Sequence, residues 1–142
     1  GLSNVLTGAM QATDVVQRSA DGSFDVITSG PLPPNPPELL AGDAMSRLLD
    51  DLRTRFDVVV IDGPPVLGLA DAPLLSHVAE ATILVAAAEQ TRRDSLRHAL
   101  RRLRASHANV LGALLTRFDL QRKGDDYGYG AYTYYSYGKK AA

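Results

Sequence analysis

The run FDVVVIDGPP, from Phe56 to Pro65, limits what this chain can fold into more than any other stretch. Four consecutive β-branched residues, Val58 to Ile61, are not interrupted by any polar residue. A run this short and apolar, with an acid before it and Gly-Pro-Pro soon after it, is typical of a strand buried on both faces. Strands of this kind form the parallel sheets of α/β proteins, so the run predicts a central strand over Val58–Ile61.

Asp62 follows directly after the predicted strand, and Gly63, Pro64 and Pro65 then turn the chain. Ligands of open parallel sheets bind beyond the carboxyl ends of the strands, so this carboxylate is expected where chemistry occurs. An apolar strand ending in Asp is the pattern of a Walker B segment, whose carboxylate helps to hold Mg²⁺ against nucleotide phosphates. Many parallel strands end in an acid, so a solvated or helix-capping Asp62 stays open as the alternative.

Composition excludes several classes of function. The 142 residues, 45% apolar and 22% charged, are ordinary for one soluble globular domain with a core. The formal net charge of -1 provides no overall basic field for nucleic acid. The sequence has no Cys for a disulfide or thiolate site, and His77, His98 and His107 have no metal-ligand spacing. No apolar run reaches the ~20 residues that a membrane-spanning helix needs.

Helical and extended patterns alternate before the central run. Five prolines between positions 31 and 37 predict a stiff, extended loop, because proline cannot continue a helix or a central strand. The other expected elements are a helix over Leu2–Thr7, a helix or edge strand at Val15-Val16, a strand over Phe24–Thr28, a helix restarting at Pro37, and a helix capped by Asp43 whose apolar face is Met45, Leu48, Leu49 and Leu52.

The alternation continues after the central run. The expected elements are a helix over Ala72–Val78 capped by Asp71, a buried strand over Thr82–Ala87, a helix from the Thr91-x-x-Asp94 capping box to about Ser106, and a strand over Val110–Thr116. Strand and helix alternate throughout, which predicts an α/β fold with a mainly parallel sheet.

Six arginines lie between Arg92 and Arg104, in the helix expected there. Arg93, Arg97, Arg101 and Arg104 fall on one stripe of it, away from the leucines. Because the whole chain is nearly neutral, a solvated face is the favoured interpretation. A contact with nucleic acid or anionic lipid is the less favoured alternative.

The C-terminal segment breaks the pattern, so we expect one domain over residues 1–119 and a mobile, exposed tail over residues 120–142. All six tyrosines of the chain fall within eleven residues of this tail, separated by Gly, Ala, Ser and Thr: Tyr127, Tyr129, Tyr132, Tyr134, Tyr135 and Tyr137. A sticky low-complexity end and a base-stacking platform are alternatives. Base stacking normally comes with interleaved cations, which are missing here, so a cluster of phosphoacceptor hydroxyls is the preferred interpretation.

Three features together resemble the bacterial tyrosine autokinases (BY-kinases) of capsule and exopolysaccharide synthesis. SGPLPPNPPELL is similar to the family's Gly-Pro-x-Pro-Pro-Asn-Pro loop, which precedes a Leu-Leu helix. FDVVVIDGPPVLGLADAPLL is similar to its Walker B region with a downstream Asp-Ala. The tyrosine cluster resembles its autophosphorylation tail. The resemblance implies a P-loop NTPase-like fold related to MinD and ParA, and a kinase that uses ATP and Mg²⁺ to phosphorylate its own tyrosines.

The resemblance also implies roles for particular residues. Asp62 would hold Mg²⁺ and Asp71 would be a second catalytic carboxylate, with helix capping as an equal alternative. The nucleotide would also be bound at Gly63, Pro64, Thr116 and Arg117. Tail tyrosines would enter the site of a neighbouring subunit in a homo-oligomer. A membrane-embedded polysaccharide co-polymerase would activate the kinase at the cytoplasmic face of the cell membrane, and no nucleic-acid partner is expected.

The sequence departs from the family's pattern at Gly63, where Thr or Ser is usual, and at Thr116, where an Asn near the adenine is usual. No Gly-x-x-x-x-Gly-Lys loop (Walker A) and no Walker A′ motif occur. We therefore expect a C-terminal part of a kinase domain that lacks the N-terminal βα portion, leaves an open edge at Val58–Ile61, and is inactive by itself. The alternatives are a MinD/ParA-like ATPase, which would have no tyrosine tail, and a non-catalytic phosphoacceptor module.

Overall fold

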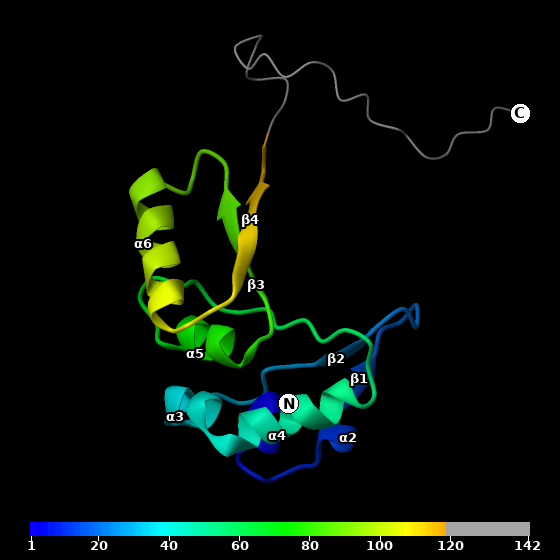
Figure 1. Cartoon of the computed structure of the whole chain (residues 1–142). Helices are drawn as coiled ribbons and strands as arrows, with labels where there is room; N and C mark the ends of the chain where they lie inside the picture. Colours follow the sequence, from blue (N-terminus) through cyan, green and yellow to red (C-terminus); the bar gives the residue numbers. More distant parts are fainter. Residues whose placement is uncertain (119–142) are drawn as a thin grey trace, which may run out of the picture.

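The structure is a computed structural model that describes residues 1–118 (Figure 1). The expected linker and the six tyrosines lie outside the described residues. The elements are, in chain order, α1 (Leu2–Leu6), α2 (Ala12–Val15), β1 (Val16–Arg18), β2 (Asp25–Ile27), α3 (Pro36–Ala41), α4 (Asp43–Arg53), α5 (Asp71–Val78), β3 (Thr82–Ala87), α6 (Arg93–Ala105) and β4 (Val110–Thr116). In the described part, no helix is both long and apolar enough to cross a membrane.

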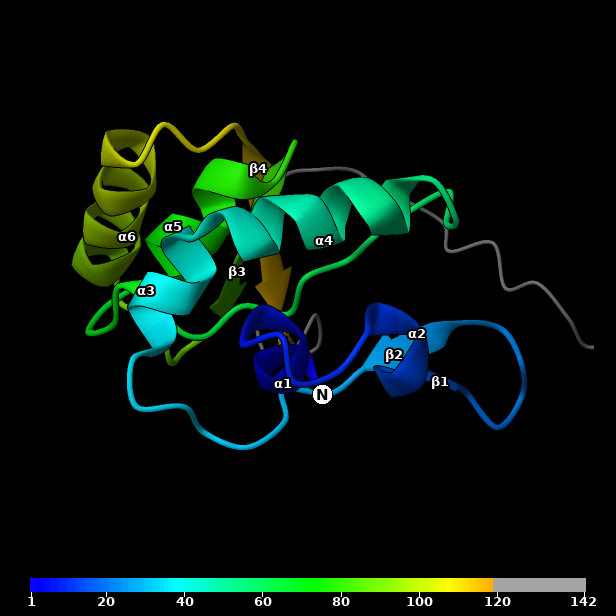
Figure 2. The same cartoon turned by 90° about the horizontal axis from the view of Figure 1, so that it is seen from below.

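The first half of the chain is a helical layer built around α4. The predicted apolar face of α4 is confirmed, because Met45, Leu48, Leu49 and Leu52 are all buried. They pack with Leu6 of α1 and Leu75 of α5, and α1, α3 and α4 lie against one another (Figure 2). The short antiparallel pair of β1 and β2 lies beside this layer (Figure 2). The sequence left open whether Val15-Val16 belong to a helix or an edge strand. Both occur, because α2 ends at Val15 and β1 begins at Val16.

The second half is a parallel β-α-β unit in which α6 connects β3 to β4 (Figure 1). The ladder aligns Leu84 with Ala113 and Ala87 with Thr116. Alternate side chains of β3 point toward α6, and Leu84 packs there with Ala99 and Leu103. Leu103, only 1% exposed, is the most deeply buried side chain of this cluster. The α/β class is therefore confirmed, with one parallel and one antiparallel strand pair among residues 1–118.

The other face of this parallel pair is open. Ile83 and Val85 of β3 are 61% and 60% exposed, although both are large and apolar. Leu114 of β4 pairs with Val85 on this face and is 55% exposed. Leu115 pairs with Ala86 and lies on the side of α6 together with Leu111, and both are also more than half exposed, so α6 covers that side of β4 only in part. The prediction of a strand over Thr82–Ala87 is therefore correct, but the prediction that it is buried is correct for one face only.

The predicted central strand over Val58–Ile61 is wrong for this structure. The segment is extended but belongs to no sheet, and Val58 and Val60 are 75% and 85% exposed. A strand exists only where its backbone N–H and C=O groups pair with a neighbour. In the described part of the chain, β3 and β4 pair with each other and no strand pairs with residues 57–65.

Three predicted helix caps are also wrong, each by a single position. The N-cap residues are Gly42, Ala70 and Arg92 in place of Asp43, Asp71 and Thr91. Asp43 and Asp71 instead begin their helices, where a carboxylate still interacts favourably with the helix dipole. The Thr91 hydroxyl accepts a hydrogen bond from the N–H of Ala87 at 3.0 Å, so it closes the turn after β3.

Candidate functional site

Asp62 lies on the extended segment between α4 and α5, with its side chain exposed. Its carboxylate makes no hydrogen bond or ion pair with the residues that the structure describes. At the neighbouring Gly63, an added Cβ would meet only Leu75 Cδ1, at 4.0 Å, and the backbone φ is not positive. The fold therefore does not require glycine at position 63, and the Thr or Ser that the resemblance leads one to expect would fit there.

The loop that follows, residues 66–70, is held in place by contacts between distant parts of the chain. Arg102 of α6 donates a hydrogen bond to the carbonyl of Leu69 at 2.6 Å. The buried Ser76 of α5 contacts the Ser106 hydroxyl at 3.2 Å, and His77 Nδ1 lies 3.1 Å from the Ser106 carbonyl. These contacts hold the loop before α5 and the last turn of α5 against the C-terminal end of α6.

Asp71 is the first residue of α5 and is half-buried. Its side chain does not form the N-terminal cap of that helix, which begins after Ala70 without a side-chain cap hydrogen bond. Like Asp62, its carboxylate makes no hydrogen bond or ion pair within residues 1–118. Both carboxylates therefore remain available to an external ligand.

Thr116 and Arg117 mark the carboxyl end of the parallel pair. The Thr116 hydroxyl donates to the carbonyl of Ala86 at 3.3 Å, and the Thr116 carbonyl accepts from the N–H of Ala88 at 2.9 Å. A hydroxyl has one donor, so Thr116 can offer a ligand only its oxygen as an acceptor. Arg117 follows with φ at 55°, in the left-handed region, so the chain changes direction immediately after β4.

The structure does not join these residues into one ready-made cluster. No hydrogen bond or ion pair links Asp62, Asp71 and Thr116, and among residues 1–118 no group of three or more His, Cys, Asp or Glu side chains could hold a metal ion. A metal bound here would need ligands besides these side chains. Mg²⁺ meets that condition, because it usually binds through one or two carboxylates together with water and substrate phosphates.

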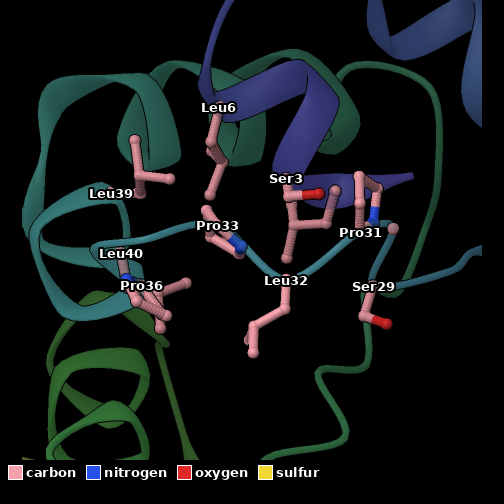
Figure 3. Close-up of a pocket in the computed structure, with 11 residues that line it drawn as sticks. Ser3, Leu6, Ser29, Pro31, Leu32, Pro33, Pro36, Leu39 and Leu40 are labelled. Atoms are coloured by element: carbon pink, nitrogen blue, oxygen red, sulfur yellow. The ribbon is translucent and has the colours of Figure 1, made fainter.

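The proline-rich loop forms an apolar cavity of about 260 Å³ between α1 and α3 (Figure 3). Figure 3 shows Pro31, Leu32 and Pro33 crossing below Leu6 and Ser3 of α1. Gly30 has φ at 78°, and an added Cβ there would come within 2.5 Å of Ser3 Oγ, so only glycine fits. The cavity carries no charged side chain, so the loop serves to hold α1 against α3 and is unsuited to binding phosphate.

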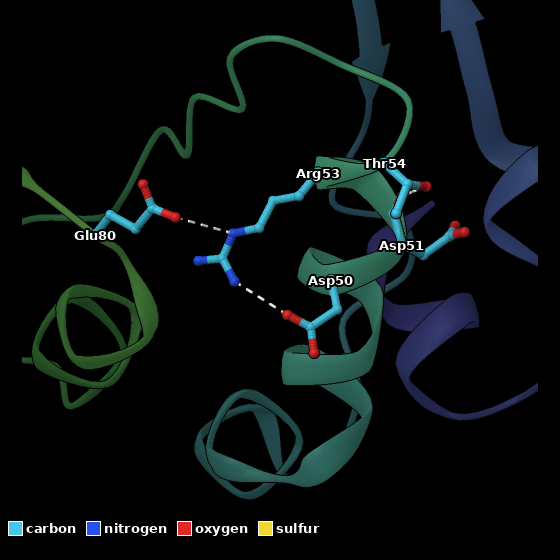
Figure 4. A network of polar contacts seen from close by, with 5 residues as sticks. All are labelled: Asp50, Asp51, Arg53, Thr54 and Glu80. Carbon is cyan, nitrogen blue, oxygen red and sulfur yellow. Dashed lines mark hydrogen bonds and ion pairs between the residues drawn. The ribbon is translucent and has the colours of Figure 1, made fainter.

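A small ion network brackets the segment that carries Asp62 (Figure 4). Arg53, at the end of α4, lies 3.0 Å from Asp50 and 3.3 Å from Glu80, which follows α5. The three side chains are 43%, 73% and 82% exposed, so water screens the pairs and each is worth about 1 kcal/mol or less. The network orients Arg53 and links the end of α4 to the residues that follow α5.

Comparison with known proteins decides which family these features belong to. The chain is 36% identical over 129 residues to the tyrosine-protein kinase YwqD of Bacillus subtilis (strain 168), covering 91% of this chain and 54% of YwqD. It is 33% identical over 115 residues to a putative tyrosine-protein kinase in the cps region of Klebsiella pneumoniae, covering 81% of this chain and 16% of that protein. No family model matches the chain.

A solved structure agrees with these relatives. The kinase domain of the Escherichia coli tyrosine kinase ETK superimposes with a TM-score of 0.77 at 34% identity, over 91% of this chain and 51% of that domain. The chain belongs to the bacterial tyrosine kinase family. It spans about half the length of YwqD and about half of the ETK kinase domain.

The structure places each of the catalytic and nucleotide-binding residues that the sequence predicts, but it does not bring them together into one cluster. Asp62, Gly63 and Pro64 lie on the extended segment, Asp71 begins α5, and Thr116 and Arg117 end the parallel pair. Sequence reasoning missed the contacts that fix the loop between them, such as that of Arg102 with Leu69. Those two residues are 33 positions apart, and no local pattern marks such a pair.

Proposed function

We propose that this chain is part of an ATP- and Mg²⁺-dependent protein-tyrosine kinase that phosphorylates its own C-terminal tyrosines and thereby regulates capsule or exopolysaccharide synthesis. The observation that carries the proposal is the likeness to tyrosine-protein kinases in both sequence and structure. The reaction transfers a phosphoryl group in line from ATP to a tyrosine hydroxyl, with ADP as the leaving group. Catalysis of this kind depends mostly on positioning and on neutralising charge.

Asp62 is the residue that we assign to Mg²⁺. Its exposed carboxylate has no internal partner, and a single carboxylate with water and phosphate oxygens is a usual Mg²⁺ environment. The ion supplies charge neutralisation at the phosphates when it is bound. Asp71, half-buried and also without an internal partner, is assigned as a second carboxylate that orients water or the incoming hydroxyl.

The remaining assignments concern the nucleotide. The backbone at Gly63 and Pro64 would lie against the phosphates, next to Asp62. Thr116 and Arg117 would lie at the base, where the Thr116 oxygen can accept a hydrogen bond from an exocyclic amine of adenine. Because the Thr116 hydroxyl is already donated to Ala86, we expect weaker selection for adenine than an Asn side chain would provide, since an amide offers both a donor and an acceptor.

The acceptors are proposed to be the clustered tyrosines between Tyr127 and Tyr137. A tail attached to an oligomer reaches neighbouring sites at effective concentrations on the order of mM, so even a weak site for tyrosine would suffice. Neighbouring subunits of a homo-oligomer are the proposed substrates, and a membrane-embedded polysaccharide co-polymerase is the proposed activator. The kinase would act in the cytoplasm, at the inner face of the membrane.

The proposal is tested with Asp62→Asn in the native polypeptide that carries this chain, incubated with Mg-ATP. We expect phosphotyrosine to be lost while the circular dichroism spectrum is unchanged, because an exposed, unpaired carboxylate contributes little to folding. Asp57→Asn is the matched control, since Asp57 is an exposed acid on the same segment. Wild-type phosphotyrosine in the Asp62 variant would remove Asp62 from the site.

A second variant separates the acceptor from the catalyst. Replacing all six tail tyrosines by Phe should eliminate phosphotyrosine and leave Mg-ATP hydrolysis intact. Phosphotyrosine that persists after that change would refute the tail as the acceptor. Loss of hydrolysis in both this variant and the Asp62→Asn variant would show that the tail contributes to the nucleotide site.

A further inference from the structure

The arginines of α6 form an exposed cationic stripe. Arg93, Arg97, Arg101 and Arg104 are all exposed, and their i, i+4, i+8 and i+11 spacing places them on one side of the helix. The helix has five arginines and one acid, Asp94, whereas the whole chain has a net charge of -1. The positive charge is therefore local to this helix.

Contacts within the described residues do not account for the stripe. Only Arg97 has an ion pair, with Asp94 at 3.4 Å, and both side chains are largely exposed. Arg93, Arg101 and Arg104 have no ion-pair partner among residues 1–118. Like charges four residues apart destabilise a helix, and arginine in the first turn opposes the helix dipole. Arg104, in the last turn, interacts favourably with the dipole, so the repulsion concerns Arg93, Arg97 and Arg101. The described residues leave most of the positive charge of the stripe unpaired, and an anion from outside the described fold could pair with it.

The stripe begins at the end of the molecule from which the tyrosine-rich segment departs. β4 ends at Thr116 beside the end of β3, where the Ala88 N–H bonds the Thr116 carbonyl at 2.9 Å. The chain enters α6 at Arg93 just beyond this point, so the start of α6 and the end of β4 lie at the same end of the parallel pair (Figure 1). The eight residues from 119 to 126 can span up to about 26 Å, and the stripe from Arg93 to Arg104 is about 17 Å long.

Phosphorylation would make this tail a match for the stripe in charge. Residues 127–138 contain six tyrosines and no charged residue. Each phosphotyrosine carries about -1.5 to -2 at neutral pH, so complete modification adds roughly nine to twelve negative charges. Guanidinium groups bind phosphate oxygens in pairs of parallel hydrogen bonds, which is the usual way that Arg clusters recognise phosphorylated segments.

We propose that the arginine stripe of α6 is the docking surface for the phosphorylated tyrosine tail of the same chain or of a neighbouring copy. This inference rests on the proposed autophosphorylation, which would supply the phosphotyrosines. Docking on α6 would hold a modified tail against the described fold, so the phosphorylated and unmodified tails would occupy different positions. The unmodified tail has no negative charge between residues 127 and 138 and does not bind the stripe.

The test measures binding of a synthetic peptide of residues 127–138, carrying phosphate on all six tyrosines and a fluorescent label, to the full chain by anisotropy. Because the phosphate is introduced chemically, the result does not depend on kinase activity. We expect binding of the phosphopeptide at about 0.1 M salt and none of the unmodified peptide. Arg93→Gln with Arg101→Gln should weaken binding roughly 5- to 20-fold, since each substitution removes charge-assisted hydrogen bonds.

The matched control is Arg18→Gln with Arg47→Gln, which makes the same change in charge at exposed arginines away from α6. It should leave the affinity unchanged within about twofold. The stripe variant should also melt at the same or a higher temperature, because it removes like-charge repulsion. A lower melting temperature together with unchanged affinity would show a structural role and overturn the proposal.

Three other results would overturn the proposal. The first is equal binding of the modified and unmodified peptides, and the second is an equal loss of affinity in the stripe variant and its matched control. The third comes from adding phosphatidylserine vesicles to the same chain: binding of the vesicles without binding of the phosphopeptide. The last would assign the stripe to a lipid surface. If the phosphopeptide binds as expected while the native polypeptide makes no phosphotyrosine, the docking surface stands and the proposed autokinase activity fails. The two proposals can thus fail separately.

Discussion

Leu84 and Ile83 are neighbours on β3 that face opposite sides of the parallel pair, and their truncation should have very different costs. Leu84 is 8% exposed and packs against α6, whereas Ile83 is 61% exposed. Leu84→Ala removes three buried carbons, worth about 0.8 kcal/mol each, and leaves a cavity. We therefore expect it to lower the free energy of unfolding by about 2.5–4 kcal/mol. Ile83→Ala removes side-chain surface that is already mostly in contact with water, so it should lower the free energy of unfolding by about 1 kcal/mol or less.

Urea unfolding followed by circular dichroism measures both costs. With a slope of about 1.5 kcal/mol per molar urea, Leu84→Ala should lower the midpoint by about 2 M and Ile83→Ala by about 0.5 M. Leu103→Ala, on the α6 side of the same cluster, should behave like Leu84→Ala. Equal losses for Leu84 and Ile83 would refute the reasoning, because they would show that the face of the sheet away from α6 is also covered in solution.

Three further predictions follow from polar groups in the fold. The Thr82 hydroxyl is buried without a hydrogen-bond partner in the described residues, so Thr82→Val should raise the free energy of unfolding by about 1 kcal/mol; a lower value would reveal an unseen partner. Hydrogen bonds from the Ser23 N–H, the Ser23 hydroxyl and the Ser19 hydroxyl lower the pKa of Asp21 to about 2, so its contribution to stability is present above pH 3.8 and is lost toward pH 2. Ser23→Ala should raise that pKa part of the way to 3.8 in an NMR titration, and no change would contradict the assigned cause. Glu80→Gln should change the free energy of unfolding by less than about 1 kcal/mol, because its pair with Arg53 is exposed, and a larger loss would mean that the pair is shielded from water.

The sequence predicted correctly those helices and strands whose formation depends on residues close together in the chain. The i, i+3, i+4, i+7 spacing of Met45, Leu48, Leu49 and Leu52 identified the buried face of α4, because a helix satisfies its own backbone and needs only a partner for one face. The strand over Val110–Thr116 was predicted with the bounds that the structure has. Helix starts were displaced by one position, which is the usual uncertainty of a helix terminus.

The prediction of a strand over Val58–Ile61 was wrong for a different reason. This run and β3 are both short and apolar, yet only β3 forms a strand, since a strand depends on a partner that its own residues do not specify. The same limit applies to the candidate site. Asp62 and Thr116 could be singled out by their places in motifs, but the contacts that hold the intervening loop join residues about 30 positions apart and leave no trace in the local sequence.

The most direct test of the account is a map of phosphate on the native polypeptide after incubation with Mg-ATP, obtained by mass spectrometry of its peptides. We expect phosphotyrosine between Tyr127 and Tyr137. It should be absent when Asp62 is replaced by Asn and present when Asp57 is replaced by Asn. Phosphate found mainly on Ser or Thr, or no phosphotyrosine in residues 127–137, would contradict the claim that this chain carries the acceptor of a tyrosine kinase.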